Sequence, residues 1–227
     1  SMAESGTTGK IFLIKTNSFG DSLWGKIYDY GGGHLDAYSI QQTLDGGYII
    51  SGHKEDTSTA SPGGGGVLDA YLIKTNSQGD TTWTNTFNTS DSIPSYAYSA
   101  QQTLDGGFIF CGNANDVYLV KTDANGAEQW HQTYNYTGSY AGGSSSVQQT
   151  SDGGYIIAGY TETSIVRNLY LIKTDGNGNI TSTFHVPTIN TSKGKLLKVT
   201  DLLGRETKGK TNQPLFYIYD DGTVEKR

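Results

Sequence analysis

The protein has 227 residues, including 31 glycines and 16 tyrosines, and its formal net charge is −6. This negative charge argues against nucleic-acid binding, which needs a basic surface. A single cysteine excludes a disulfide within the chain. No apolar run approaches the roughly 20 residues of a membrane-spanning helix, so no membrane span is expected.

One stretch of sequence occurs three times along the chain. It is clearest at residues 117–162, and the same pattern occupies residues 11–55 and 70–115. A shortened fourth copy begins at Leu169. The repeated unit is about 47 residues long, and the first copy carries a Gly-rich insertion after Glu55. Such a repeat decides the architecture and is therefore the first feature to establish.

Each unit contains four short runs rich in β-branched and aromatic residues, which in the third copy are 117–121, 129–134, 144–150 and 155–160. Asn-Gly and Asp-Gly pairs between the runs supply the positive φ angles of tight hairpin turns. No stretch keeps an apolar period of 3.6 residues, so we expect almost no helix. The pattern predicts an all-β fold, a β-propeller with three full four-stranded blades and a partial fourth. A β-trefoil is the alternative.

Three features recur in register in every full copy: a strand lysine, a tryptophan nine residues later, and an Asp-Gly-Gly turn. Because they serve every copy alike, we predict that they are structural. We expect the tryptophans to pack between blades and the aspartates to accept turn hydrogen bonds. We expect the lysines to bury their stems and to pair with an aspartate, as in Lys121 with Asp152. The recurring residues are Lys15, Lys74, Lys121, Lys173, Trp24, Trp83, Trp130, Asp45, Asp105 and Asp152.

Three loops differ between the copies, at residues 28–36, 88–95 and 135–143. We expect them to connect the second and third strands of each unit and to gather on one face. Variable loops on a rigid scaffold often carry binding sites, and exposed tyrosines suit stacking on sugar rings. The alternative is that these tyrosines cover blade edges. The candidate ligand-binding residues in or beside the loops are Tyr30, His34, Tyr96, Tyr136 and Tyr140.

The fourth copy continues into a turn with oxygen-bearing side chains at alternate positions. Asp175, Asn177 and Asn179 therefore resemble ligands of a calcium-binding loop. A plain hairpin turn is the alternative, because the later glutamate and flanking helices of such loops are missing. No other metal or cofactor is expected, since no two of the four histidines share metal-ligand spacing. The histidines are His34, His53, His131 and His185.

Composition changes near the C-terminal end of the chain. We predict a repeat domain at 1–184, a linker at 185–193 and a small β tail at 194–227. The tail contains Lys-Val-Thr-Asp-Leu-Leu-Gly-Arg-Glu at 198–206 and Leu-Phe-Tyr-Ile-Tyr-Asp-Asp-Gly-Thr-Val-Glu-Lys-Arg at 215–227. These stretches closely resemble the C-terminal sorting domain of Bacteroidetes proteins exported by the type IX secretion system. Members of that family usually continue beyond Glu-Lys-Arg, so the tail is expected to be incomplete or to complete the last blade.

The repeats at 11–180 also resemble the Asp-Gly-Gly-Tyr propeller-like repeats of secreted proteins of the same bacteria. Both resemblances imply a protein that is secreted or attached to the outer membrane, on the extracellular side. They also imply that the tail has the type IX secretion machinery as a partner.

The sequence shows no phosphate loop, nucleophile elbow or other catalytic motif. We therefore predict a non-catalytic binding or adhesion module with a polysaccharide or cell-surface glycan as its ligand. A glycan-cleaving enzyme with paired carboxylates and a purely structural surface repeat are the alternatives.

Three and a half blades do not close a typical propeller of four to eight blades. We expect one of three solutions. The tail strands complete a fourth blade with residues 169–174, two chains form a homodimer through their open blade edges, or the repeats belong to a longer array.

Overall fold

The computed structural model comprises two compact units, Ser1–Val186 and Pro187–Arg227. Their boundary falls inside the segment 185–193 that the sequence predicts as a linker. The statements below concern the described residues, which are 9–30, 33–59, 66–89, 93–135, 141–162, 167–185, 195–200, 206–207, 215–220 and 224–226.

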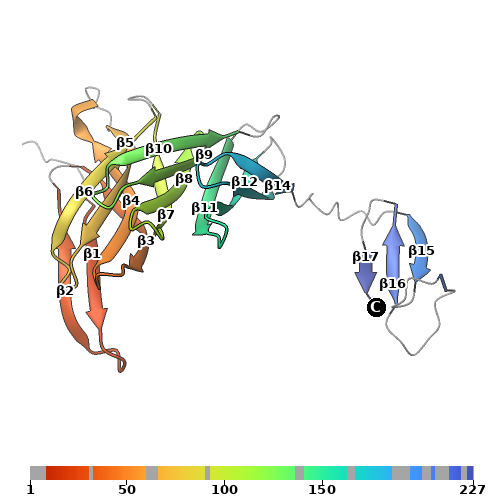
Figure 1. Ribbon diagram of the computed structural model, residues 1–227, viewed down its shortest axis with the longest axis horizontal. Coiled ribbons are helices and arrows are strands. Elements are labelled where there is room, and N and C mark those ends of the chain that lie inside the picture. The colour runs from red at the N-terminus through yellow and green to blue at the C-terminus, as the bar shows by residue number, and fades with distance from the viewer. Residues whose placement is uncertain are drawn as a thin grey trace, which may run out of the picture. The chain divides into compact units, whose positions relative to one another are not determined.

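Three four-stranded antiparallel sheets make up most of the first unit (Figure 1). Blade 1 consists of β3 (Leu35–Gln42), β4 (Tyr48–Asp56), β5 (Val67–Thr75) and β6 (Thr81–Phe87). Blade 2 consists of β7 (Tyr96–Gln102), β8 (Phe108–Ala114), β9 (Asp116–Thr122) and β10 (Glu128–Tyr134). Blade 3 consists of β11 (Ala141–Gln149), β12 (Tyr155–Glu162), β13 (Arg167–Thr174) and β14 (Ile180–His185). A single 3-10 turn, η1 (Thr57–Thr59), follows β4, and the described residues contain no α-helix.

A two-stranded sheet precedes blade 1, and we call it the half-blade. It pairs β1 (Ile11–Thr16) with β2 (Ser22–Tyr28). Lys15 faces Trp24 in this sheet as Lys74 faces Trp83 in blade 1, so β1 and β2 correspond to the third and fourth strands of a blade. Among the described residues, nothing supplies the first two strands.

The sequence repeat and the blades are out of phase by two strands. Residues 117–162 supply β9 and β10 to blade 2, and then β11 and β12 to blade 3. The variable loops after β2, β6 and β10 are therefore crossovers from one sheet to the next. Four-stranded, propeller-like blades are confirmed, but placing those loops inside a blade was wrong, and the partial blade lies at the start of the array.

The tail strands do not complete a blade with residues 169–174. In blade 3, β13 is already paired on both sides, with β12 and with β14. The tail instead forms its own three-stranded sheet of β15 (Leu196–Thr200), β16 (Phe216–Tyr219) and β17 (Val224–Lys226). That predicted fourth blade is wrong because the second hairpin of the third repeat fills the place the tail was expected to take.

The core lies between successive sheets. Consecutive residues of a strand point to opposite faces, so Ile49 packs with Phe108 of blade 2 while Ile50 packs with Ile11 and Tyr28 of the half-blade. Both faces of the inner strands are thus buried, which explains their continuous apolar runs. Within the first unit, each sheet contacts the next in chain order, and the described strands form no closed barrel, unlike a trefoil.

The recurring tryptophans lie at the junctions between sheets. Each ring contacts the aromatic residue that follows Asp-Gly-Gly in the next sheet. It also lies against a turn glycine of that sheet, where a Cβ on Gly126 would come within 2.7 Å of Trp83. The ring centroids are 6.0 Å apart for Trp24–Tyr48, 5.5 Å for Trp83–Phe108 and 6.0 Å for Trp130–Tyr155.

The recurring lysines pair with the aspartate of the first turn in the same blade. The Nζ to Oδ2 distances are 2.7 Å for Lys74–Asp45, 2.8 Å for Lys121–Asp105 and 3.0 Å for Lys173–Asp152. The expected pairing of Lys121 with Asp152 is wrong because these residues belong to different blades. Lys15 has no such aspartate in the half-blade, and its Nζ donates to the Tyr48 hydroxyl at 2.5 Å.

Candidate functional site

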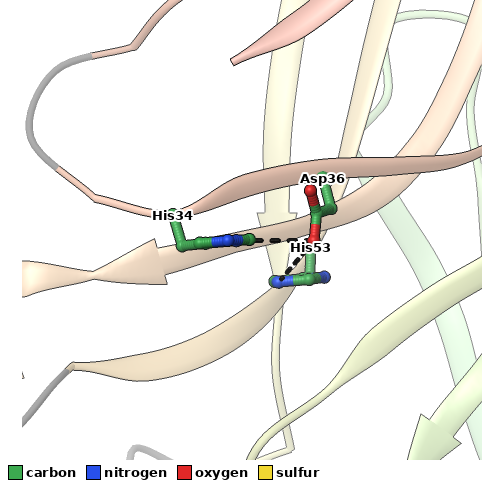
Figure 2. A group of neighbouring side chains, drawn as sticks. All are labelled: His34, Asp36 and His53. Carbon is green, nitrogen blue, oxygen red and sulfur yellow. Dashed lines mark ion pairs between the residues drawn. The ribbon is translucent and has the colours of Figure 1, made fainter. Parts of the chain in front are cut away.

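Two histidines and an aspartate meet at one end of blade 1 (Figure 2). His34 precedes β3, Asp36 lies in β3 and His53 lies in β4. Their potential ligand atoms all lie within 4.8 Å of one another. This is the one such group of three that the described part of the chain contains.

Hairpin register places Asp36 directly opposite His53. His34 is positioned by Glu55 through its backbone. The His34 N–H donates to Glu55 Oε2 at 2.9 Å, and the Glu55 N–H donates to the His34 carbonyl at 2.8 Å. Glu55 Oε1 also accepts the Gly66 N–H at 2.7 Å. Hydrogen bonds from these two N–H groups lower the pKa of Glu55, so this carboxylate stays ionised and anchors the loop.

One oxygen of Asp36 faces both rings. Asp36 Oδ2 lies 3.4 Å from His34 Nδ1 and 3.9 Å from His53 Nε2, and both dashed lines in Figure 2 meet there. The two imidazoles are stacked, with centroids 5.8 Å apart and planes 3° from parallel. His53 is buried, and burial lowers its pKa, although Asp36 opposes the shift. Its ring is therefore neutral at neutral pH.

Tyrosines surround the buried His53. The Tyr38 hydroxyl lies 2.9 Å from His53 Nδ1. Tyr96 of blade 2 meets the His53 ring edge-on, with centroids 5.3 Å apart. Tyr98 stacks on Tyr96 at 5.8 Å and also contacts Tyr38 at 5.0 Å. Burial, with Tyr98 and Asp36 adding to it, raises the pKa of Tyr38 to about 12. We call the six residues the His–Tyr cluster: His34, Asp36, Tyr38, His53, Tyr96 and Tyr98.

The cluster departs from the repeat. The cross-strand pair Asp36–His53 corresponds to Tyr96–Asn113 in blade 2 and to Gly143–Tyr160 in blade 3. A feature that every blade needs would be present in all three, as the lysine and Asp-Gly-Gly are. The His–Asp group belongs to one blade, so the repeated blade architecture does not account for it.

Two of the five predicted ligand-binding residues meet in this cluster, because His34 and Tyr96 both contact His53. Tyr30 lies elsewhere. Its ring contacts Tyr71 at 5.7 Å and its hydroxyl lies 2.7 Å from Thr81 Oγ1, as expected for a residue that covers a blade edge. Tyr136 and Tyr140 lie outside the described residues.

Asp36, Tyr38, His53 and Tyr98 were not among the predicted ligand-binding residues. Spacing along the chain does not reveal this group, because His34 and His53 meet across a hairpin. A usable signal was present. Folding the chain about the Asp45-Gly46 turn, with the one-residue bulge between Ala37 and Ser39, pairs Asp36 with His53.

The loop proposed for calcium is a hairpin turn. Asp175 Oδ1 accepts the N–H groups of Asn177 and Asn179 at 2.9 and 2.8 Å, and its Oδ2 accepts the Asn179 amide at 2.9 Å. Asn76 and Asp123 accept the same pair of backbone N–H groups in the equivalent turns of blades 1 and 2. The turn explains these oxygens without an ion, and calcium binding there stays a prediction.

A polar cavity of about 360 Å³ lies beside the anchor of His34. Lys54, Glu55, Asp69 and Asn88 are among its lining residues. Asn88 donates to Asp69 Oδ1 at 3.2 Å, so part of its wall is held by blade 1 itself.

Comparisons with known proteins assign no function. No protein-family model matches the chain, and no curated protein matches it. Among solved structures it is similar to a protein of unknown function from Bacteroides caccae, with 10% identity and a TM-score of 0.39 over 96% of this chain and 92% of that one. A likeness at this level supports no conclusion about shared fold or function. The described residues include no helix long and apolar enough to cross a membrane.

Proposed function

We propose that the protein is a non-catalytic carbohydrate-binding module and that the His–Tyr cluster is its binding site. The observation that carries this proposal is the grouping of three tyrosine rings beside accessible polar groups. The side chains of His34 and Asp36 are 44% and 48% exposed, and Tyr38 is 44% exposed. Aromatic faces stack on the apolar face of a sugar ring, and a carboxylate accepts hydrogen bonds from its hydroxyls.

The position of the cluster supports the proposal. Five of its residues come from β3, β4 and β7, which belong to two contacting blades, and His34 directly precedes β3. A site built on strands holds its side chains in place before the ligand arrives, and this reduces the entropy lost on binding. Tyr96 and Tyr98 are stacked with planes only 2° from parallel, so they present rings of one orientation.

The arrangement of carboxylates favours binding over glycan cleavage. Glycoside hydrolysis uses two carboxyl groups, one of which must hold a proton to act as general acid. Asp36 is the carboxylate of the cluster, and the nearby Glu55 has both oxygens engaged by backbone N–H groups. Those hydrogen bonds lower the pKa of Glu55, which makes it a poor proton donor.

The proposal includes action outside the cell, on the secreted protein or at the outer membrane. Its support is the sequence of the tail at 198–206 and 215–227, which resembles type IX sorting domains. Export through that system would bring the module to environmental or cell-surface polysaccharides.

A glycan-array screen of the whole chain tests the proposal. Wild-type protein is compared with Tyr38→Ala and Tyr98→Ala, and Tyr30→Ala is the matched control because Tyr30 lies outside the cluster. We expect reproducible hits that weaken about tenfold in the two cluster variants, which corresponds to about 1.4 kcal/mol, and that persist in the control. A blank array, or equal loss in all three variants, would overturn the proposal.

A further inference from the structure

We propose that His34, Asp36 and His53 bind a divalent transition-metal ion, with Zn²⁺ as the ion best suited to these ligands. This inference does not rest on carbohydrate binding. It rests on the chemistry and the positions of three side chains that the repeat does not require.

The ligand set suits such an ion. Zinc binds imidazole nitrogens and carboxylate oxygens at about 2.0–2.2 Å, usually in tetrahedral geometry. Neighbouring ligand atoms of such a site lie roughly 3.3 Å apart, as those bond lengths require. The 3.4 Å between Asp36 Oδ2 and His34 Nδ1 matches this spacing, and the 3.9 Å to His53 Nε2 exceeds it by little. Small side-chain rotations would bring all three atoms onto one ion.

Neighbouring groups orient the ligands as in known metal sites. A ligating histidine usually donates its second N–H to an oxygen, which fixes its tautomer. Tyr38 offers its hydroxyl oxygen to His53 Nδ1 at 2.9 Å, so the tautomer with Nδ1–H leaves Nε2 free to bind metal towards Asp36. His34 is held through its backbone by the two hydrogen bonds with Glu55.

Three protein ligands leave a fourth tetrahedral position open. The exposure of the His34 and Asp36 side chains gives that position access to solvent, and the cluster tyrosines lie beside it. Water or an oxygen of a bound ligand would complete the coordination. A site with three protein ligands and one open position is typical of metals that contact a ligand rather than only stabilise a fold.

Isothermal titration of the full, untagged chain with ZnCl₂ tests the inference. We expect one equivalent to bind, and binding to weaken at least tenfold in His34→Ala and Asp36→Asn. Both variants alter half-exposed side chains and should fold. His131→Ala is the matched control, since His131 lies on β10 and pairs with Glu128. Circular dichroism of each variant verifies folding.

Two results would overturn the metal site: no saturable binding by the wild type, or unchanged binding in both cluster variants. Co²⁺ provides a second readout, because tetrahedral coordination gives a visible absorption that His34→Ala should abolish. No glycan is present in either titration. Failure of the metal site would therefore leave the carbohydrate proposal standing, and the reverse holds as well.

Discussion

At the scale of single residues, each of the three positions of the Asp-Gly-Gly turn has a different structural role. In blade 2, Asp105 Oδ1 accepts from the Thr103 hydroxyl and the Gly107 N–H. Gly106 has a φ of 83°, which favours glycine. Gly107 leaves room for the Lys121 ammonium. Each position of the motif therefore has its own physical reason, and all three blades share it.

The Lys121–Asp105 pair should show strong energetic coupling. Lys121 is only 5% exposed, so Asp105→Asn leaves a buried ammonium with weaker partners. We expect a loss of about 1–3 kcal/mol in the free energy of unfolding. Double-mutant cycles in urea should give a clear coupling energy for Lys121 with Asp105 and near-additivity for Lys121 with Asp152. Equal coupling in the two cycles would contradict the observed pairing.

Low pH should reduce the free energy of unfolding because it protonates the turn aspartates Asp45 and Asp105. A hydrogen bond from Lys74 lowers the pKa of Asp45 to about 2. Burial opposes the shift at Asp105, but hydrogen bonds from Lys121 and Thr103 outweigh it, and that pKa is also about 2. A depressed folded-state pKa adds stability above the ordinary value of 3.8, and this stability is lost as the pH falls towards 2.

Urea unfolding at several pH values between 6 and 2 measures this effect. Wild-type stability should fall most steeply below about pH 4. The Asp45→Asn and Asp105→Asn variants should start less stable and show a shallower fall. Identical slopes in wild type and variants would mean that other carboxylates control acid unfolding.

At the scale of elements, the glycine of the second hairpin turn joins one blade to the next. Gly79, Gly126 and Gly178 have φ values of 79–81° and lie against the tryptophan of the preceding sheet. The tryptophan thus packs on a surface that only a glycine turn leaves open. Blade-to-blade packing depends on these contacts as well as on the strand faces.

Two alanine substitutions separate backbone strain from this packing. Gly106→Ala meets nothing within 4 Å, so it should cost roughly 1 kcal/mol for the positive φ alone. In Gly126→Ala, the Cβ would also lie 2.7 Å from both Trp83 and the Asn85 amide, which should add roughly 1–3 kcal/mol. Thermal unfolding compares the two. A Gly126→Ala protein as stable as Gly106→Ala would argue against the close tryptophan contact.

Strand positions followed from the sequence, but strand partners did not. The runs at 117–121 and 155–160 predict β9 and β12 because period and turn chemistry are local. Whether β10 continues into β11 within one sheet or crosses to another depends on packing between sheets. The variable loop between them carries no local signal for that choice. The His–Asp group could not be predicted for a similar reason, because the bulge between Ala37 and Ser39 decides which side chains of β3 and β4 lie opposite each other.

At the scale of the whole molecule, the sheets bury continuous apolar layers between them, and Cys111 reports on one layer. It lies between blades 2 and 3 and is fully buried. Burial raises the pKa of its thiol to about 12, against a hydrogen bond with Ser144. The thiol is therefore protected from chemical modification in two ways, because reagents cannot reach it and because little of it is ionised to the reactive thiolate.

Thiol labelling at pH 8 should be very slow in the native protein and fast in denaturant. The labelling rate should rise with urea in parallel with the unfolding transition, because Cys111 becomes accessible only when blades 2 and 3 separate. Ala158→Cys, at the equivalent position of blade 3, is a useful comparison. Rapid labelling of Cys111 under native conditions would show that the layer between the two blades opens easily.

Because the sequence repeat and the blade are offset by two strands, each repeat contributes strands to two neighbouring blades and links them. Every blade is assembled from the second half of one repeat and the first half of the next, so no single repeat encodes a sheet that could separate from its neighbours. Excising residues 117–162 would remove β9 and β10 of blade 2 with β11 and β12 of blade 3, and it would bring β7–β8 next to β13–β14, which are the two complementary halves of a blade. Excising 35–87 would instead remove one complete sheet. Duplication of a repeat would therefore lengthen the array by one blade. The unit that is repeated in the sequence is the second half of one blade followed by the first half of the next, whereas the unit that folds as a sheet is the blade.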